Sequence, residues 1–236
     1  MNINIVGQRE EGKTTLALYL ARQHNPAVIV FDPRGNIEGA VVWGPDEMEQ
    51  AIQERVYEDE PIVYRYDSED PDEEFSDFCM VLFPPRFPRG GFSVVIDECN
   101  MLQNANSIHP ALRRAIKQHP TKPPERSVAI IQTTHVLGEF NSKSRSLMNE
   151  LYMFRIQGVR DLKVVEEHTG NQQVAEIVKN LPQHHCVRYL YSRQAEGKPE
   201  YYVWSDPTVW NNAATDFSGP QKPKIVYKSE APIRVI

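Results

Sequence analysis

Cysteine and long apolar runs are both scarce in this sequence. The three cysteines, Cys79, Cys99 and Cys186, are odd in number and lack C-x-x-C spacing, which argues against a disulfide framework and a structural zinc site. Apolar stretches such as 27–31 are far shorter than the roughly 18 residues of a membrane span. Residues 1–6 alternate like a strand and lack the features of a secretory signal. We therefore expect free thiols, no transmembrane segment and a cytoplasmic location.

The composition is that of an ordinary globular domain. The chain has 236 residues, 40% apolar and 25% charged, which excludes collagenous, coiled-coil and wholly disordered chains. No Gly/Ser-rich or charge-rich linker divides its middle, so we predict one domain over residues 1–217. Prolines and scattered charges follow, and we expect residues 218–236 to form an extended C-terminal tail, either disordered or packed on the domain or on a neighbouring subunit.

Charge is unevenly distributed along the chain, whose formal net charge is −6. Between Asp46 and Asp77 stand fourteen acidic residues against Arg55 and Arg65, a local charge of −12, which leaves +6 on the rest of the chain. An acidic run of this kind is usually a solvated surface. The total charge gives no bulk attraction to nucleic acid, but the basic remainder is compatible with a basic face on the molecule.

Strand-like apolar segments alternate with helical ones along most of the chain. This alternation predicts an α/β fold, with a mostly parallel sheet that carries helices on both faces. The expected strands are 3–6, 28–31, 62–66, 92–96 and 128–131, followed by a terminal hairpin of 187–191 and 201–204. The expected helices are 13–23, 46–57, 71–82, 110–118, 160–168 and 172–180.

Residues 7–14 match the phosphate-binding pattern G-x-x-x-x-G-K-[ST], between the first strand and the first helix. In such a loop, backbone N–H groups and the helix N-terminus surround the phosphates. Lys13 reaches the β- and γ-phosphates, and the Thr14 hydroxyl is a ligand for Mg²⁺. We therefore predict an ATP site made of Gly7, Gln8, Arg9, Glu10, Glu11, Gly12, Lys13, Thr14 and Thr15.

Two carboxylates, Glu10 and Glu11, are unusual beside a polyphosphate, which they repel. We expect both side chains to point outward, so that only their backbone N–H groups face the ligand. Glu10 also stands where many such loops have glycine, so the loop has to close without the conformational freedom of glycine.

An apolar strand ends in two further acids, Asp97 and Glu98. At the end of a strand parallel to the first one, Asp97 is placed to bind Mg²⁺ and Glu98 to act as the base for a water molecule. Cys99 follows without a basic partner nearby in sequence, so we interpret it as a packed thiol.

The later strand 128–131 leads into a polar group, Gln132 to His135. We expect Gln132 or His135 to contact the γ-phosphate or the attacking water, and spacing does not choose between them. A metal site built from His168, His184 and His185 is disfavoured, because adjacent residues of an extended segment point to opposite faces.

Taken together, the 7–14 loop, the Asp32-Pro33-Arg34-Gly35 turn, Asp97-Glu98 and the polar 132–135 strand end resemble the FtsK–HerA superfamily of P-loop ATPases. The resemblance covers residues 1–191 and is strongest to the small genome-packaging ATPases of membrane-containing icosahedral phages and viruses. It implies a RecA-like ATPase core that assembles as a ring, usually a hexamer, and moves double-stranded DNA into a capsid. Capsid or membrane-vertex proteins would be further partners, in the host cytoplasm or on the virion.

Ring motors of this kind complete each site with an arginine from the next subunit. The candidates are Arg113, Arg114 and Arg126, and we favour Arg126. Residues 109–126 carry five basic residues against Glu125. This stretch is either a channel surface for DNA phosphates or an ordinary basic helix face.

Two other functions stay open at this point. A P-loop kinase for a small molecule requires a lid with arginines and an acceptor pocket, whereas Glu98 after Asp97 favours attack by water. A non-catalytic assembly module would bind ATP without turnover.

Overall fold

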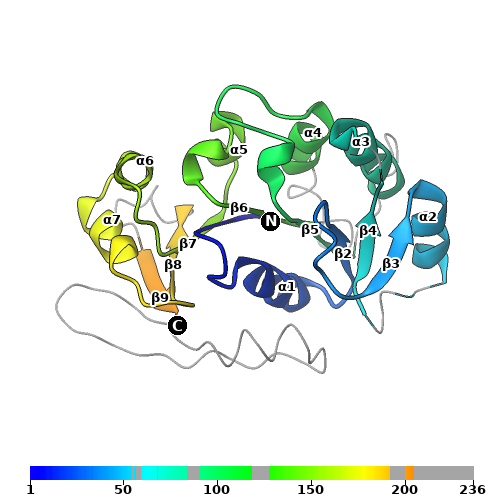
Figure 1. Cartoon of the computed structure of the whole chain (residues 1–236), viewed down its shortest axis with the longest axis horizontal. Coiled ribbons are helices and arrows are strands. Elements are labelled where there is room, and N and C mark those ends of the chain that lie inside the picture. Colours follow the sequence, from blue (N-terminus) through cyan, green and yellow to red (C-terminus); the bar gives the residue numbers. More distant parts are fainter. Residues whose placement is uncertain are drawn as a thin grey trace.

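The apolar strand segments come together in one mostly parallel sheet (Figure 1). The computed structural model describes residues 1–54, 56, 60–67, 69–83, 91–118 and 128–191, and the backbone of 200–204. In this part of the chain the strand order is β3-β4-β2-β5-β6-β1-β7-β8-β9. The β7–β8 and β8–β9 pairs are antiparallel, and the other neighbouring pairs are parallel.

The strands are β1 (Asn2–Val6), β2 (Val28–Phe31), β3 (Ala40–Trp43), β4 (Ile62–Arg65), β5 (Ser93–Ile96), β6 (Ala129–Thr134), β7 (Glu150–Phe154), β8 (Cys186–Leu190) and β9 (Glu200–Trp204). The α-helices are α1 (Lys13–His24), α2 (Pro45–Gln53), α3 (Pro71–Leu82), α4 (Pro110–Gln118), α5 (Ser142–Ser146), α6 (Val159–Thr169) and α7 (Gln172–Lys179). Two 3-10 turns are η2 (Cys99–Met101) and η5 (Leu137–Glu139).

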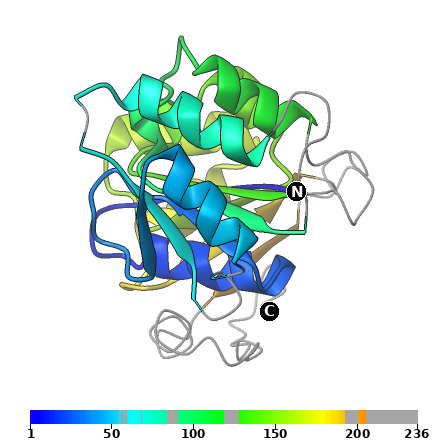
Figure 2. The ribbon, with the colours of Figure 1, turned by 90° about the vertical axis from the view of Figure 1, so that its right-hand side faces the viewer.

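Each face of the sheet has its own apolar core. Side chains alternate between faces along a strand, so Val28 and Val30 of β2 pack with α1, whereas Ile29 and Phe31 pack on the side of α2, α3 and α4. Figures 1 and 2 show α1 below the sheet and α3, α4 and α5 above it. The prediction of an α/β sheet with helices on both faces is therefore confirmed, in the form of a RecA-like fold.

Strand β6 lies between β1 and β5. The three strands are parallel, so their carboxyl ends meet at the same edge of the sheet. The 7–14 loop follows β1, and Asp97-Glu98 follows β5. This strand order brings three segments that are distant in sequence into one place.

Several element boundaries differ from the sequence-based expectation. The second helix ends at Gln53 instead of residue 57. Strand β6 continues through Gln132 to Thr134 because it stays paired with β1 up to Val6. Strands β3 and β7 were not predicted; all five residues of β7 are buried, so no polar–apolar alternation indicates a strand. The terminal hairpin is confirmed as β8 and β9.

The predicted boundary at residues 217/218 and the tail 218–236 lie outside the described residues. Of the helices that the structure describes, none is both long enough and apolar enough to cross a bilayer.

Candidate functional site

The 7–14 loop connects β1 to α1 and depends on two glycines. A Cβ atom on Gly7 would come within 2.4 Å of the Cβ of Phe154 in β7, so no larger residue fits. Gly12 precedes α1 with a φ of 94°. Glu10 has a φ of 61°, a left-handed conformation that costs a non-glycine residue about 1–2 kcal/mol. The loop thus adopts at Glu10 the turn for which similar loops use glycine, and it does so under strain.

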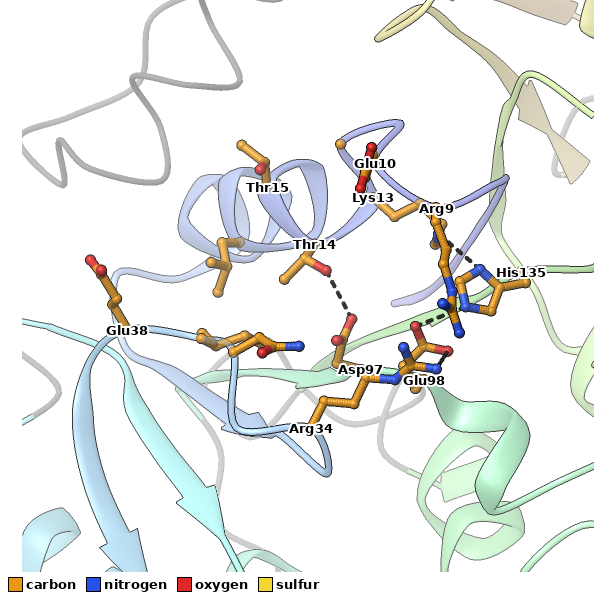
Figure 3. A pocket seen from close by; sticks show the side chains of 14 residues that line it. Arg9, Glu10, Lys13, Thr14, Thr15, Arg34, Glu38, Asp97, Glu98 and His135 are labelled. Carbon is orange, nitrogen blue, oxygen red and sulfur yellow. Dashed lines mark hydrogen bonds and ion pairs between the residues drawn. The ribbon is translucent and has the colours of Figure 1, made fainter.

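A pocket of about 510 Å³ opens at this loop (Figure 3), a size in the range of small-molecule sites. It is lined by polar side chains from the loop, from the 34–38 segment after β2, and from the ends of β5 and β6. The lining residues are Arg9, Glu10, Gly12, Lys13, Thr14, Thr15, Leu18, Arg34, Asn36, Ile37, Glu38, Asp97, Glu98 and His135.

Lys13 is buried at the start of α1, with its ammonium group turned to the loop. Its Nζ donates to the carbonyl oxygen of Gln8 at 2.8 Å and lies 3.3 Å from Nδ1 of His135. Burial lowers the pKa of Lys13, and the nearby carboxylates of Glu98 and Asp97 oppose this shift. An anion in the pocket would stabilise the ammonium form, as a phosphate-binding lysine requires.

Asp97 has the surroundings of a metal ligand. Its Oδ1 accepts hydrogen bonds from the hydroxyls of Thr14 at 3.1 Å and Thr133 at 2.7 Å (Figure 3 draws the first). Burial raises the pKa of Asp97, and the hydrogen bonds from Thr133 and Thr14 oppose this shift. A carboxylate and a hydroxyl side by side are oxygen ligands of the kind that Mg²⁺ prefers, so Thr14 and Asp97 fit the predicted metal site.

Glu98 points into the same pocket with 7% of its surface exposed. Its Oε1 lies 3.1 Å from Nε2 of His135, and its Oε2 lies 3.5 Å from a guanidinium nitrogen of Arg34. The His135 contact is close but not well directed as a hydrogen bond. Glu98 also has a φ of 48°, a conformation that is costly for glutamate and is found mainly where function requires it.

Arg34 was not predicted as a site residue, although the turn that carries it was recognised. The buried Asp32 carboxylate builds this turn by accepting hydrogen bonds from the backbone N–H groups of Arg34, Gly35 and Ile37. Arg65 lies 3.6 Å from the same carboxylate. The turn thereby holds Arg34 at the mouth of the pocket, opposite Glu98.

The two loop carboxylates behave differently. Glu10 is exposed but lines the pocket, whereas Glu11 is 2% exposed. The Glu11 side chain thus points away from the pocket, but into the protein interior instead of into solvent. Its Oε1 accepts a hydrogen bond from Arg155 at 2.8 Å, and its Oε2 accepts one from the backbone N–H of His184 at 3.3 Å. Glu11 does not line the pocket, so an arginine neutralises it on the far side of the loop.

Gln132 and His135 occupy different places. The amide of Gln132 is buried between Asn4 and Gln103, with hydrogen bonds to both, and it does not line the pocket. Because side chains alternate along β6, the next residue, Thr133, faces Asp97 instead. His135 lines the pocket and contacts both Lys13 and Glu98.

The two arginine candidates that the structure describes do not line the pocket. Arg113 and Arg114 are exposed on α4, and Arg126 lies outside the described residues. Burial raises the pKa of Cys99, which fits a packed thiol. The described residues contain no group of three histidine, cysteine or acidic side chains placed to hold a metal ion.

Comparison by sequence finds no match to this chain among family models or curated proteins. Comparison by structure does. The genome packaging NTPase B204 from Sulfolobus turreted icosahedral virus 2 in complex with AMPPCP aligns with a TM-score of 0.63 and 18% identity, over 84% of this chain and 95% of that one. The complex of the same protein with ATP-gammaS aligns with a TM-score of 0.64 and 17% identity, over 85% of this chain and 95% of that one. VirB4 of Thermoanaerobacter pseudethanolicus aligns with a TM-score of 0.55 and 10% identity, over 88% of this chain and 90% of that one.

At these identities the likeness concerns the fold. It spans nearly the full length of the B204 chain. It supports the RecA-like α/β fold that the sequence predicted.

Proposed function

We propose that this chain binds ATP with Mg²⁺ in the pocket of the 7–14 loop and hydrolyses it. The observation that carries the proposal is the contact between Thr14 and Asp97, with Glu98 and Lys13 in the same pocket. These are the four side chains that phosphoryl transfer to water requires from a P-loop site.

Each residue has a separate task in this proposal. The backbone of the loop, from Gly7 to Thr15, surrounds the phosphates, and Lys13 balances charge at the γ-phosphate. Thr14 and Asp97 would hold Mg²⁺, which when bound neutralises charge on the phosphate oxygens. Glu98 accepts the proton of the attacking water, and His135 positions the Glu98 carboxylate through its 3.1 Å contact.

We further propose that hydrolysis drives the packaging of double-stranded DNA into a viral capsid, by a ring of copies of this chain. Its support is the fold shared with B204, a genome packaging NTPase, together with the exposed basic residues of α4. In such a ring the arginine from the neighbouring subunit would be Arg126, Arg113 or Arg114. The ring would act in the host cytoplasm, with capsid or membrane-vertex proteins as partners.

An ATPase assay with and without duplex DNA tests both levels of the proposal. We expect Mg²⁺-dependent phosphate release that increases when DNA is added. ATP hydrolysis without any response to DNA would support the proposed ATPase activity and contradict the proposed role as a DNA motor. Phosphate transfer to an added small alcohol or nucleotide would favour the kinase, and ATP binding without turnover would favour the assembly module.

A further inference from the structure

The carboxylate of Glu98 is contacted by cationic and polar groups of its own chain. Arg34 lies 3.5 Å from one carboxylate oxygen, and His135 lies 3.1 Å from the other. Asn100, with its amide nitrogen turned toward Glu98, is 3.2 Å from the oxygen that Arg34 contacts. Both carboxylate oxygens of Glu98 therefore already have a partner within the pocket.

The turn that carries Arg34 places its side chain where it can contact a phosphate in the pocket. The three backbone hydrogen bonds to the buried Asp32 carboxylate hold its turn, while its side chain is 38% exposed and lines the pocket. Figure 3 shows Arg34 beside Glu98, and Lys13 on the other side of the pocket next to His135. A γ-phosphate held by Lys13 next to Glu98 would be within reach of both cations.

The triphosphate and Glu98 compete for this arginine. A terminal phosphate carries more charge than a carboxylate and accepts two parallel hydrogen bonds from a guanidinium. The 3.5 Å contact to Glu98 is longer than a charge-assisted hydrogen bond. ATP is therefore the stronger partner for Arg34, whereas ADP does not place a phosphate next to Glu98.

We infer that Arg34 is a catalytic residue that senses the γ-phosphate from within its own subunit. In this proposal Arg34 exchanges its contact with Glu98 for the γ-phosphate when ATP binds, which frees Glu98 to act as a base. This inference rests on the proposed ATPase function. The water oxygen then bonds to the γ-phosphorus, its proton passes to Glu98, and the bond from phosphorus to the β–γ bridging oxygen breaks to give ADP and phosphate. Arg34 stabilises the charge that develops during this step.

A double-mutant cycle on binding tests the exchange of partners without hydrolysis. We would titrate AMPPCP and ADP into wild type, Arg34→Gln, Glu98→Gln and the double variant by calorimetry. Arg34→Gln should lower the affinity for AMPPCP about tenfold. Its affinity for ADP should stay within about twofold of that of the wild type. Glu98→Gln should tighten AMPPCP about threefold or more, and only while Arg34 is present. The inference would be overturned if Arg34→Gln lowered the affinities for AMPPCP and ADP equally. It would also be overturned if Glu98→Gln raised the affinity for AMPPCP by the same factor when Arg34 is replaced.

Turnover provides the second readout. Arg34→Gln should lower kcat by about 100-fold or more, in the range of other phosphate-stabilising arginines, and Arg34→Lys should recover part of the loss. Arg160→Gln, a change at an exposed arginine of α6 outside the pocket, is the matched control and should leave kcat unchanged.

The two readouts separate the inference from the function on which it rests. Wild-type hydrolysis with an unchanged kcat in Arg34→Gln would reject the role of Arg34 and retain the ATPase. A wild type that binds AMPPCP but does not hydrolyse ATP would reject the proposed function, and with it the catalytic role of Arg34. ADP binding by each variant shows that it is folded.

Discussion

Lys13 is a buried cation whose neighbours hold it ready for a phosphate. Burial lowers its pKa, while Asp97 and Glu98 favour the charged form. Removal of the side chain leaves these two carboxylates facing the phosphates with less positive charge between them. At the scale of single residues, the charge of Lys13 therefore offsets these carboxylates within the pocket.

We predict that Lys13→Ala abolishes ATP binding or reduces turnover by at least about 100-fold, because backbone N–H groups do not replace its charge at the γ-phosphate. Binding is measured with a fluorescent ATP analogue and turnover by phosphate release. Lys179→Ala, at an exposed lysine of α7, is the control. Normal turnover in folded Lys13→Ala protein would remove the site assignment.

Glu98 is expected to separate binding from chemistry. Glu98→Gln keeps the shape of the side chain but removes the base, so hydrolysis should fall by about 100-fold or more while ATP binding persists. Single-turnover hydrolysis and equilibrium binding measure the two effects. Glu176→Gln, an exposed change on α7, controls for the loss of one charge. A rate near that of wild type would exclude Glu98 as the base.

At the scale of elements, the buried pair of Glu11 and Arg155 connects the phosphate loop to the end of β7. The 2.8 Å contact joins residues 144 positions apart in sequence. Gly7 packs against Phe154 of the same strand. The outer side of the loop is thus supported by the strand next to β1, so the loop conformation depends on β7.

We predict that Arg155→Met lowers the free energy of unfolding by about 1–2 kcal/mol, because it leaves the buried Glu11 carboxylate without its cation. The partial exposure of Arg155 to solvent reduces this effect. Urea denaturation measures this change. ATP affinity should fall as well, and Glu11→Gln in the same chain should restore part of the stability.

The exposed pair of Lys163 and Glu167 on α6, 3.8 Å apart, provides the comparison for this prediction. Lys163→Met should cost less than about 0.5 kcal/mol. If Arg155→Met were no more costly than Lys163→Met, the Glu11 contact would have no role in holding the loop.

At the scale of the whole molecule, acidic and basic surfaces lie on different helices. Acidic residues gather on α2 and α3. On α4, Leu112, Ala115 and Ile116 are buried, whereas Arg113, Arg114 and Lys117 are exposed. One subunit with a net charge of −6 should bind DNA poorly, but a ring would bring several copies of the basic face together.

We predict that neutralising Arg113, Arg114 and Lys117 together reduces DNA-stimulated turnover and flattens the salt dependence of DNA binding by about one unit of slope for each lost phosphate contact. ATP binding should stay intact because none of the three lines the pocket. The measurements are ATPase rates with duplex DNA and binding over a range of salt concentrations.

A matched variant that neutralises Arg160, Lys163 and Lys179 on α6 and α7 removes the same charge from another surface. DNA stimulation that survives the α4 variant but is lost in this control would place the DNA contact on α6 and α7 instead.

The sequence alone determined the parts of this protein whose signals are local. A glycine-rich loop between a strand and a helix predicts a phosphate site from neighbouring residues, and 71–82 and 110–118 match α3 and α4 because apolar spacing and a proline at the start define them. Asp97 and Glu98 were found for the same reason, since each directly follows a clear strand.

Only the tertiary structure decided which side chains meet. The sequence did not choose between Gln132 and His135, because the choice depends on how far β6 continues along β1 and hence on which residues its pleat turns toward the loop. Arg34 contacts Glu98, and Arg155 contacts Glu11. The members of each pair are far apart in sequence and meet because of the order of the strands in the sheet. Contacts of this kind arise from the packing of the whole sheet, and no local pattern of residues encodes them.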